Sequence, residues 1–136
     1  NQVPYSLLTR QIESNGILEK ARQLGVTILA YSPLAQGLLT GKYTPENVSE
    51  LQGARRIDPR FSPQGLKKLA PLLAEIEKIA EKYEKTPAQV SLNWLISQGN
   101  VIPIPGAKNA KQAIQNAGAL GWSMSPEEVK NLGSVV

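Results

Sequence analysis

The order of apolar and polar positions along the chain predicts short strands that alternate with helices. Three apolar runs, at 3–7, 26–31 and 101–104, have the composition of strands. The run at 26–31 is apolar or β-branched without interruption, which is typical of a parallel strand buried on both faces. Between the first two runs, apolar and small residues follow helical spacing over 17–24, and Gly25 ends that helix.

The second half of the chain predicts four more helices. The pattern over 62–85 is helical, with Pro71 expected to kink the helix or to mark a restart. Two helices begin at Thr86 and Ser125, because each hydroxyl precedes a proline and lies three residues before a Gln or Glu. A further helix is predicted over 109–117, after a third strand that two prolines keep short.

Strands that alternate with helices predict an α/β fold with a parallel sheet and right-handed crossovers. With only three strands, the sheet has two free edges and one incompletely covered face. Such a sheet is a poor free-standing domain but an ordinary slice of a (β/α)₈ TIM barrel. The free edges could also pair with a second copy of the chain. We therefore treat 1–136 as part of a single barrel domain.

Composition excludes several classes of chemistry. The chain has 136 residues, a net charge of +4, 41% hydrophobic residues, and neither Cys nor His. Disulfides, thiolate nucleophiles and Ser-His-Asp triads are therefore excluded within this chain, and no metal site is predicted. The modest net charge, few aromatic residues and lack of a recognition motif do not favour nucleic-acid binding.

Targeting signals are not evident in the sequence. No apolar run approaches the ~20 residues that a membrane span needs, and residues 1–4 lack the layout of a signal peptide. The chain does not begin with Met, which is typical of a processed chain or of one cut from a longer protein. Its compartment, cytoplasm or plastid stroma, stays open.

The segment from Tyr31 to Lys42 is the first candidate for ligand binding. It follows a predicted buried strand, and in parallel α/β sheets ligands bind beyond the carboxyl ends of the strands. Gly37 and Gly41 let the backbone approach a ligand closely, and Lys42 supplies a positive charge. A plain turn with glycines for flexibility explains the same residues, so the spacing alone leaves both interpretations open.

The segment 104–109, after the third predicted strand, is the second candidate. Gln112 and Asn116, four residues apart, lie on one face of the helix that follows. Asn109 or a neighbour can cap this helix, and its free N–H groups beside Lys108 form an anion site that suits phosphate. The alternative is that Lys108 is merely solvated and Asn116 is a surface residue.

Four blocks of this chain resemble the carboxyl-terminal part of the aldo-keto reductases and occur in the same order. They are Asn1-Gln2 with Tyr5-Ser6-Leu7-Leu8, 31–43, Thr86-Pro87-Ala88-Gln89 with Asn93-Trp94, and 102–109 with Gln112 and Asn116. The resemblance is strongest to the branch with plant and bacterial members and the β subunits of voltage-gated potassium channels. It implies a (β/α)₈ barrel in which this chain forms strands six, seven and eight.

The resemblance also implies a cofactor, NADPH or NADP, bound in extended form across the carboxyl-terminal face of the barrel without a Rossmann motif. Gln2 corresponds to the position that hydrogen-bonds the nicotinamide carboxamide, and Tyr31 to the one that stacks on the nicotinamide ring. The pyrophosphate cradle corresponds to Ser32, Leu34, Gln36, Gly37 and Lys42. The positions for the 2′-phosphate and adenine correspond to Gly106, Lys108, Gln112 and Asn116.

The activity implied by the resemblance is reduction of a small aldehyde or ketone by hydride transfer from NADPH, with a Tyr protonating the oxygen. The family's catalytic Asp, Tyr, Lys and His lie on the first four strands, so this chain holds none of them. It would be inactive alone and would depend on the amino-terminal half of the barrel. One alternative is a non-catalytic NADPH-binding interaction subunit like the channel β subunits, and another is a stand-alone half-barrel that binds neither cofactor nor partner.

Other conspicuous residues are predicted to be structural. Trp94 and Trp122 are predicted to be packing residues. The long connection over 44–61, which contains Arg55, Arg56 and Arg60, is predicted to be a solvated loop; the alternative is a lid, since long loops over an active face are often lids.

Overall fold

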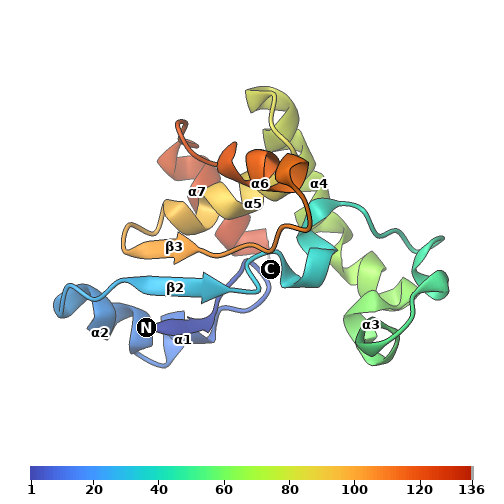
Figure 1. Cartoon of the computed structure of the whole chain (residues 1–136), viewed down its shortest axis with the longest axis horizontal. Coiled ribbons are helices and arrows are strands. Elements are labelled where there is room, and N and C mark those ends of the chain that lie inside the picture. Colours follow the sequence, from blue (N-terminus) through green and yellow to red (C-terminus); the bar gives the residue numbers. More distant parts are fainter. Residues whose placement is uncertain (136) are drawn as a thin grey trace.

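A computed structural model describes residues 1–135 and contains one parallel sheet of three strands. The strands β1 (Gln2–Pro4), β2 (Ile28–Tyr31) and β3 (Val101–Pro103) lie in the order β1-β2-β3, and both pairings are parallel. The three arrows in Figure 1 point the same way, so the carboxyl ends of the strands lie together at one end of the sheet. The predicted parallel sheet is confirmed.

Each strand is shorter than the apolar run that predicted it. The run at 3–7 contributes only β1, because the Ser6 hydroxyl accepts the N–H groups of Leu8 and Thr9 and turns the chain out of the sheet. Of the run at 26–31, only Ile28 to Tyr31 form β2. The strand begins late because the N–H of Val26 still donates to the carbonyl of Ala21 in the preceding helix. Apolar composition therefore overestimates the length of the ladder.

Helices occupy the connections and follow the last strand (Figure 1). Before β2 lie α1 (Gln11–Ser14) and α2 (Ile17–Gln23). Between β2 and β3 lie α3 (Ala54–Ile57), α4 (Pro63–Tyr83) and α5 (Pro87–Ile96). The same connection holds a kinked 3₁₀ segment at Ala35–Thr40 and single 3₁₀ turns at Val48–Glu50 and Pro59–Phe61. After β3 lie α6 (Ala110–Ala117) and α7 (Pro126–Val135).

The helix α4 decides one of the two alternatives for Pro71. Pro71 was expected to kink the helix or to mark a restart, and the restart is wrong, because α4 is a single helix from Pro63 to Tyr83 with Pro71 inside it. Pro71 is exposed, so water can take the hydrogen bond that the carbonyl of Lys67 loses. Buried apolar residues on both sides of Pro71, including Leu66 and Ile76, hold the two halves against one core.

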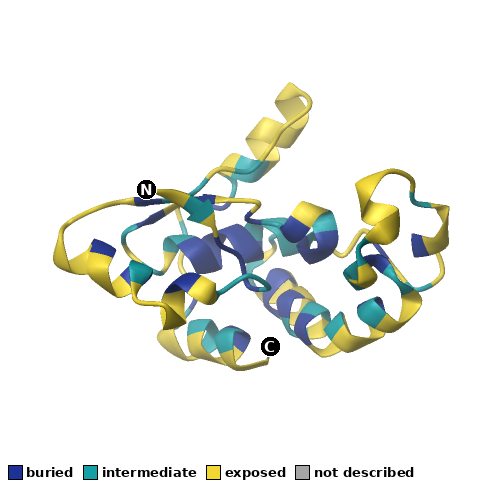
Figure 2. Ribbon diagram, turned by 90° about the horizontal axis from the view of Figure 1, so that it is seen from below, coloured by how far each residue is buried: buried dark blue, intermediate teal, exposed yellow. Residues whose placement is uncertain are grey.

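The core centres on α5, where every residue from Val90 to Leu95 is buried, and Figure 2 shows the buried residues gathered in the middle of the molecule. Trp94 packs edge-on against Tyr5, with ring centroids 5.8 Å apart, and its indole N–H donates to the carbonyl of Val129 at 3.1 Å. Trp122 stacks obliquely on Tyr83 at 5.1 Å. Both tryptophans are packing residues, as predicted.

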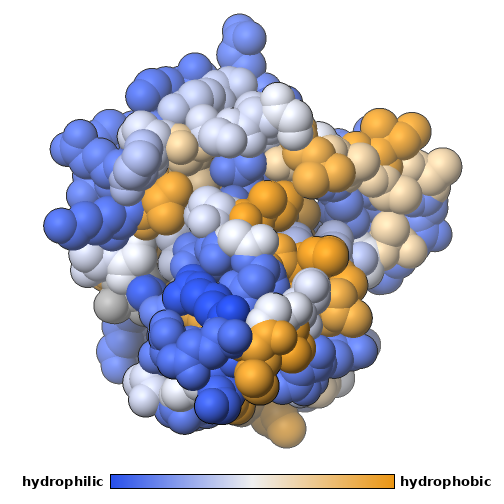
Figure 3. Space-filling view, turned by 90° about the vertical axis from the view of Figure 1, so that its left-hand side faces the viewer, coloured by the Kyte–Doolittle hydropathy of each residue, from blue (hydrophilic) through white to orange (hydrophobic). Residues whose placement is uncertain are grey.

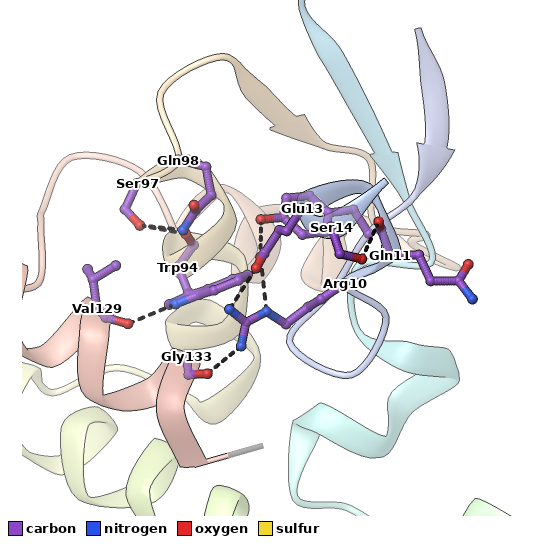
Figure 4. A network of polar contacts seen from close by, with 10 residues as sticks. Arg10, Gln11, Glu13, Ser14, Trp94, Ser97, Gln98, Val129 and Gly133 are labelled. Atoms are coloured by element: carbon purple, nitrogen blue, oxygen red, sulfur yellow. Dashed lines mark hydrogen bonds and ion pairs between the residues drawn. The ribbon is translucent and has the colours of Figure 1, made fainter. Parts of the chain in front are cut away.

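A polar network joins the turn after β1 to α5 and α7 (Figure 4). The Arg10 guanidinium lies over Trp94, 5.2 Å from the ring centroid, and donates to the carbonyl of Gly133 and to Glu13. Burial alone raises the pKa of Glu13, but hydrogen bonds from Arg10 and Tyr5 lower it overall. The ionised carboxylate thereby holds Arg10 against Trp94 of α5 and Gly133 of α7.

The other face of the sheet is open to solvent. Ile28, Ala30 and Val101 point to the buried face, and the residues that alternate with them, Tyr31 and Ile102, are 40% and 54% exposed. Seen from the side where the strands begin, apolar patches interrupt the hydrophilic surface (Figure 3). Within residues 1–135, no helix combines the length and the apolar character that crossing a membrane requires.

Candidate functional site

A cleft of about 780 Å³ opens where the segment after β2 meets the segment after β3. Both segments start at the carboxyl ends of neighbouring parallel strands, which brings residues about seventy positions apart to one place. Nine of the eleven residues predicted from the sequence line this cleft: Ser32, Leu34, Gln36, Gly37, Lys42, Gly106, Lys108, Gln112 and Asn116. The two separately predicted candidates are therefore parts of one site.

The segment after β2 is wound into an unusual backbone conformation. Ser32, Ala35 and Gln36 have φ values of 49°, 50° and 58°, in the left-handed region that non-glycine residues rarely adopt. Gly37 follows with a φ of 99°, and a Cβ there would lie 3.0 Å from Cε2 of Tyr43. Glycine is therefore required at 37 for its backbone conformation and for the close approach of the tyrosine ring.

The ring of Tyr43 packs against this segment at Gly37. The ring is buried and packs edge-on against Phe61, with centroids 5.2 Å apart. The Thr40 hydroxyl donates to the carbonyl of Gly37 at 2.6 Å and accepts the N–H of Lys42 at 3.2 Å. The turn that presents Lys42 to the cleft is thus fixed by side chains of its own segment.

Two basic groups lie close to the ring of Tyr43. The Nζ of Lys42 is 5.7 Å and the Cζ of Arg55 is 6.0 Å from the ring centroid, and both residues line the cleft. Arg55 is exposed, as predicted for a solvated connection, but it lies in the short helix α3 instead of a loop, and it lines the cleft. No local pattern marks it, since its position depends on how 44–61 folds back over the segment after β2.

The remaining arginines of that connection have other surroundings. Arg60 forms an ion pair with Asp58 at 2.7 Å, and the hydrogen bonds from its guanidinium hold the pKa of Asp58 below its usual value. The same carboxylate caps the 3₁₀ turn Pro59–Phe61 by accepting the N–H of Arg60. Arg56 is exposed and does not line the cleft. The prediction that Arg60 is structural agrees with this pairing.

The opposite wall of the cleft is formed by α6 and the residues before it. The Asn109 side chain accepts the N–H of Gln112 at 2.9 Å, which confirms the predicted cap. The side chain of Gln112 accepts the N–H of Lys108 at 2.7 Å, and that of Asn116 donates to the carbonyl of Gly106 at 3.1 Å. Both amides therefore hold the loop 106–108 against the helix, and Lys108 remains exposed at the rim.

Gln2 and Tyr31 are the two predicted residues that do not line the cleft. Tyr31 is the last residue of β2 and directly precedes Ser32. Gln2 pairs with Leu29, two residues before Tyr31, so both side chains lie on the open face of the sheet. They form a second surface next to the cleft instead of a part of it.

The sequence analysis missed the contribution of α5 to the cleft. Thr86 and Ala88, at the amino-terminal end of α5, line it together with Gln115 of α6. Thr86 was recognised as a helix cap, which is a local pattern. That this cap also lines the cleft between the two predicted segments depends on tertiary packing. The arrangement as a whole, with Lys42, Arg55 and Lys108 around one cleft, suits an extended anionic ligand.

Comparisons with known proteins identify the family of this chain. The model of the aldo/keto reductase family matches residues 1–136. The aldo-keto reductase str7 of Strobilurus tenacellus is 44% identical over 131 residues, which are 94% of this chain and 39% of that protein. The aldo-keto reductase yakc of Schizosaccharomyces pombe, whose name specifies NADP(+), is 39% identical over 135 residues, 96% of this chain and 39% of that protein.

Among solved structures, the glycerol dehydrogenase AKR11B4 from Gluconobacter oxydans superposes with a TM-score of 0.89 at 34% identity, covering 98% of this chain and 41% of that one. The described strands and helices are thus part of a (β/α)₈ TIM barrel, as predicted. The chain spans about two fifths of the length of the relatives it matches. On these matches and this fold, the chain belongs to the aldo/keto reductase family.

Proposed function

We propose that this chain is the cofactor-binding part of an NADP-dependent oxidoreductase that reduces aldehydes or ketones to alcohols. The observation that carries the proposal is the cleft at the carboxyl ends of β2 and β3, with three basic side chains at its walls. The name of the yeast relative yakc, which specifies NADP(+), supports the choice of cofactor.

The chemistry of the cleft fits the anionic part of NADPH. Lys42 and Arg55 supply two positive charges beside the segment after β2, where a pyrophosphate would be held. Lys108 precedes the capped amino-terminal end of α6, where the positive end of the helix dipole favours a phosphate. We assign the 2′-phosphate to Lys108 and the adenine to the face of α6 that carries Gln112 and Asn116.

The open face of the sheet fits the nicotinamide end. Tyr31 offers an exposed aromatic ring directly beside the cleft, and such a ring can stack on a flat heterocycle and fix which of its faces is presented. Gln2 lies on the same face and carries an amide that can both donate to and accept from a carboxamide. We assign Tyr31 to stacking and Gln2 to the carboxamide.

Bound NADPH supplies a hydride to the carbonyl carbon of the substrate. The residues of this chain bind the cofactor and orient its ring, and none of them is proposed to be catalytic. The groups that protonate the carbonyl oxygen would come from barrel strands upstream of β1. The same strands would cover the open face of the sheet and contact the small carbonyl substrate.

Cofactor titration of the complete barrel, which joins this chain to its upstream strands, tests the proposal. The barrel should quench its tryptophan fluorescence on binding NADPH. Lys108→Ala should weaken NADPH roughly tenfold or more and NADH far less, since the lost charge-assisted contact to a 2′-phosphate amounts to about 1.5–3 kcal/mol. Lys111→Ala is the matched control, because Lys111 is an exposed lysine of α6 that does not line the cleft.

Equal weakening of NADPH and NADH in Lys108→Ala would contradict the assignment of the 2′-phosphate. No binding of either cofactor to the complete barrel would contradict the proposed function itself. NADPH binding without aldehyde or ketone reduction would favour the alternative, a non-catalytic NADPH-binding subunit.

A further inference from the structure

The helix α6 forms one wall of the cleft but is weakly attached to the rest of the described chain. It contributes no buried residue, and Figure 2 shows it projecting from the molecule with almost every residue exposed. Its largest apolar side chain, Ile114, is 72% exposed. The position of this wall therefore depends on polar contacts with α5 at the carboxyl-terminal end of the helix.

Gln89 in the first turn of α5 makes the central contact. Its Oε1 accepts the N–H of Thr86 at 3.0 Å and completes the capping box of α5. Its Nε2 donates to the carbonyl of Gln115 in the last turn of α6 at 2.8 Å. One half-buried amide thus joins the cap of α5 to the end of α6, with its oxygen bonded to α5 and its nitrogen bonded to α6.

Two neighbours leave this contact little freedom. Asn93, one turn further along the same face of α5, is buried and donates to the carbonyls of Ala119 at 3.0 Å and Trp122 at 2.9 Å. At Gly118, just after α6, a Cβ would lie only 2.2 Å from Nε2 of Gln89. A side chain at 118 would therefore fit only if the amide of Gln89 moved away from its present position.

If the carboxyl-terminal end of α6 moved, the whole helix would move and the wall of the cleft would move with it. Gln112 and Asn116 hold the loop 106–108 against the helix, so helix and loop move together. Gln89 does not line the cleft, whereas Lys108, Gln112 and Asn116 do. The contact from Gln89 to Gln115 therefore sets how far this wall stands from the wall that Lys42 forms.

We propose that Gln89 is a positioning residue for the adenosine end of the cofactor and thereby determines the affinity for that end. The proposal rests on the proposed function and deepens it. Gln89 acts on the ligand only through the placement of α6. Loss of its contact should weaken binding of the adenosine portion and leave binding of the nicotinamide portion unchanged, because Tyr31 and Gln2 belong to the sheet.

Two variants of the complete barrel remove the contact in independent ways. Gln89→Glu keeps an oxygen that accepts the N–H of Thr86 but places a second carboxylate oxygen against the carbonyl of Gln115. Gly118→Ala keeps the Gln89 side chain but pushes its amide away with the added methyl group. Gly118 has a φ of −65°, so alanine brings no backbone strain. The matched control is Ser125→Ala, which removes a helix cap at α7, away from the cleft.

Calorimetric titration should use two probes, adenosine 2′,5′-bisphosphate and reduced nicotinamide mononucleotide. We expect both variants to bind the bisphosphate roughly tenfold more weakly, as loss of one hydrogen bond and exposure of its partner produce, with unchanged binding of the mononucleotide. Ser125→Ala should lower the melting temperature and leave both affinities unchanged.

Unchanged affinity for the bisphosphate in both variants would overturn the proposal, as would equal weakening of both probes, which indicates general destabilisation. Failure of the unmodified barrel to bind NADPH would instead contradict the proposed function, and the role of Gln89 would fall with it. The two failures are therefore distinguishable in one set of titrations.

Discussion

Glu128, which does not line the cleft, joins two helices through the hydrogen bonds of one side chain. Its Oε1 accepts from the Tyr83 hydroxyl at 2.6 Å and from the N–H of Ser125 at 2.9 Å, and its Oε2 accepts from Lys82 at 3.1 Å. Burial alone raises the pKa of this carboxyl, but the hydrogen bonds outweigh burial and lower the pKa to about 2. One carboxylate therefore caps α7 and joins it to the end of α4.

The lowered pKa predicts a dependence of stability on pH. Between pH 4.5, the ordinary value for this carboxyl, and about pH 2, the unfolded chain binds a proton at Glu128 that the folded chain does not bind. The free energy of unfolding should therefore fall as the pH falls through this window. In Glu128→Gln the fall should be smaller, as measured by urea denaturation at pH 6 and pH 3. Glu127→Gln, at an exposed neighbour, should behave like the parent, and a parent-like slope in Glu128→Gln would contradict the prediction.

At the scale of elements, the support of the cleft extends from its surface to the start of α4. Tyr43 lies under the segment after β2, Phe61 packs against Tyr43, and Phe61 ends the 3₁₀ turn that precedes α4. Gly65 in the first turn of α4 lets this turn approach closely, because a Cβ at 65 would lie 2.3 Å from the carbonyl oxygen of Pro59 and 2.7 Å from that of Arg60.

Gly65→Ala should therefore destabilise the protein despite the higher helix propensity of alanine. The propensity gain is about 1 kcal/mol at most, whereas a clash with backbone atoms that cannot rotate away costs ~1–3 kcal/mol or more. Gln64→Ala, at the exposed preceding position, should change the free energy of unfolding by less than about 0.5 kcal/mol. Thermal denaturation of both variants checks the pair, and a Gly65→Ala variant as stable as Gln64→Ala would show that the 3₁₀ turn can move.

Local patterns predicted the elements well, and tertiary packing decided the rest. Thr86 carries its capping signal in four consecutive residues, and the predicted hydrogen bonds are present. Pro71 left a kink and a restart open, and the sequence could not exclude the restart because the exposure of Pro71 depends on which face of α4 meets the core. The location of Arg55 was not predictable, since it depends on the path of 44–61. Whether any of the eleven predicted residues, Gln2 and Tyr31 among them, contacts a cofactor stays a prediction.

At the scale of the whole molecule, the sheet presents one buried and one open face, and β1 and β3 are its two edges. Tyr31, Ile102 and Ile104, each 39% exposed or more, form an apolar surface on the open side. Unpaired strand edges next to exposed apolar residues favour association with another chain. In a complete barrel the upstream strands would fill both roles, by pairing with the edges and by covering the open face.

The open face of the chain alone and the covered face of the complete barrel predict opposite effects of the substitution Ile102→Lys. The chain expressed alone should associate with itself, so that light scattering gives a mass above the 14.7 kDa of one copy. Ile102→Lys should reduce that association, because a charge on an exposed strand face opposes pairing, and should leave the buried core intact.

In the complete barrel the same lysine would be buried among apolar side chains and should lower the free energy of unfolding by several kcal/mol. Lys67→Ala, on the exposed surface of α4, is the control and should change neither property. A monodisperse monomer of the chain alone, with a cooperative melting transition, would contradict the first expectation. Equal stability of the complete barrel with and without Ile102→Lys would show that the upstream strands do not cover this face.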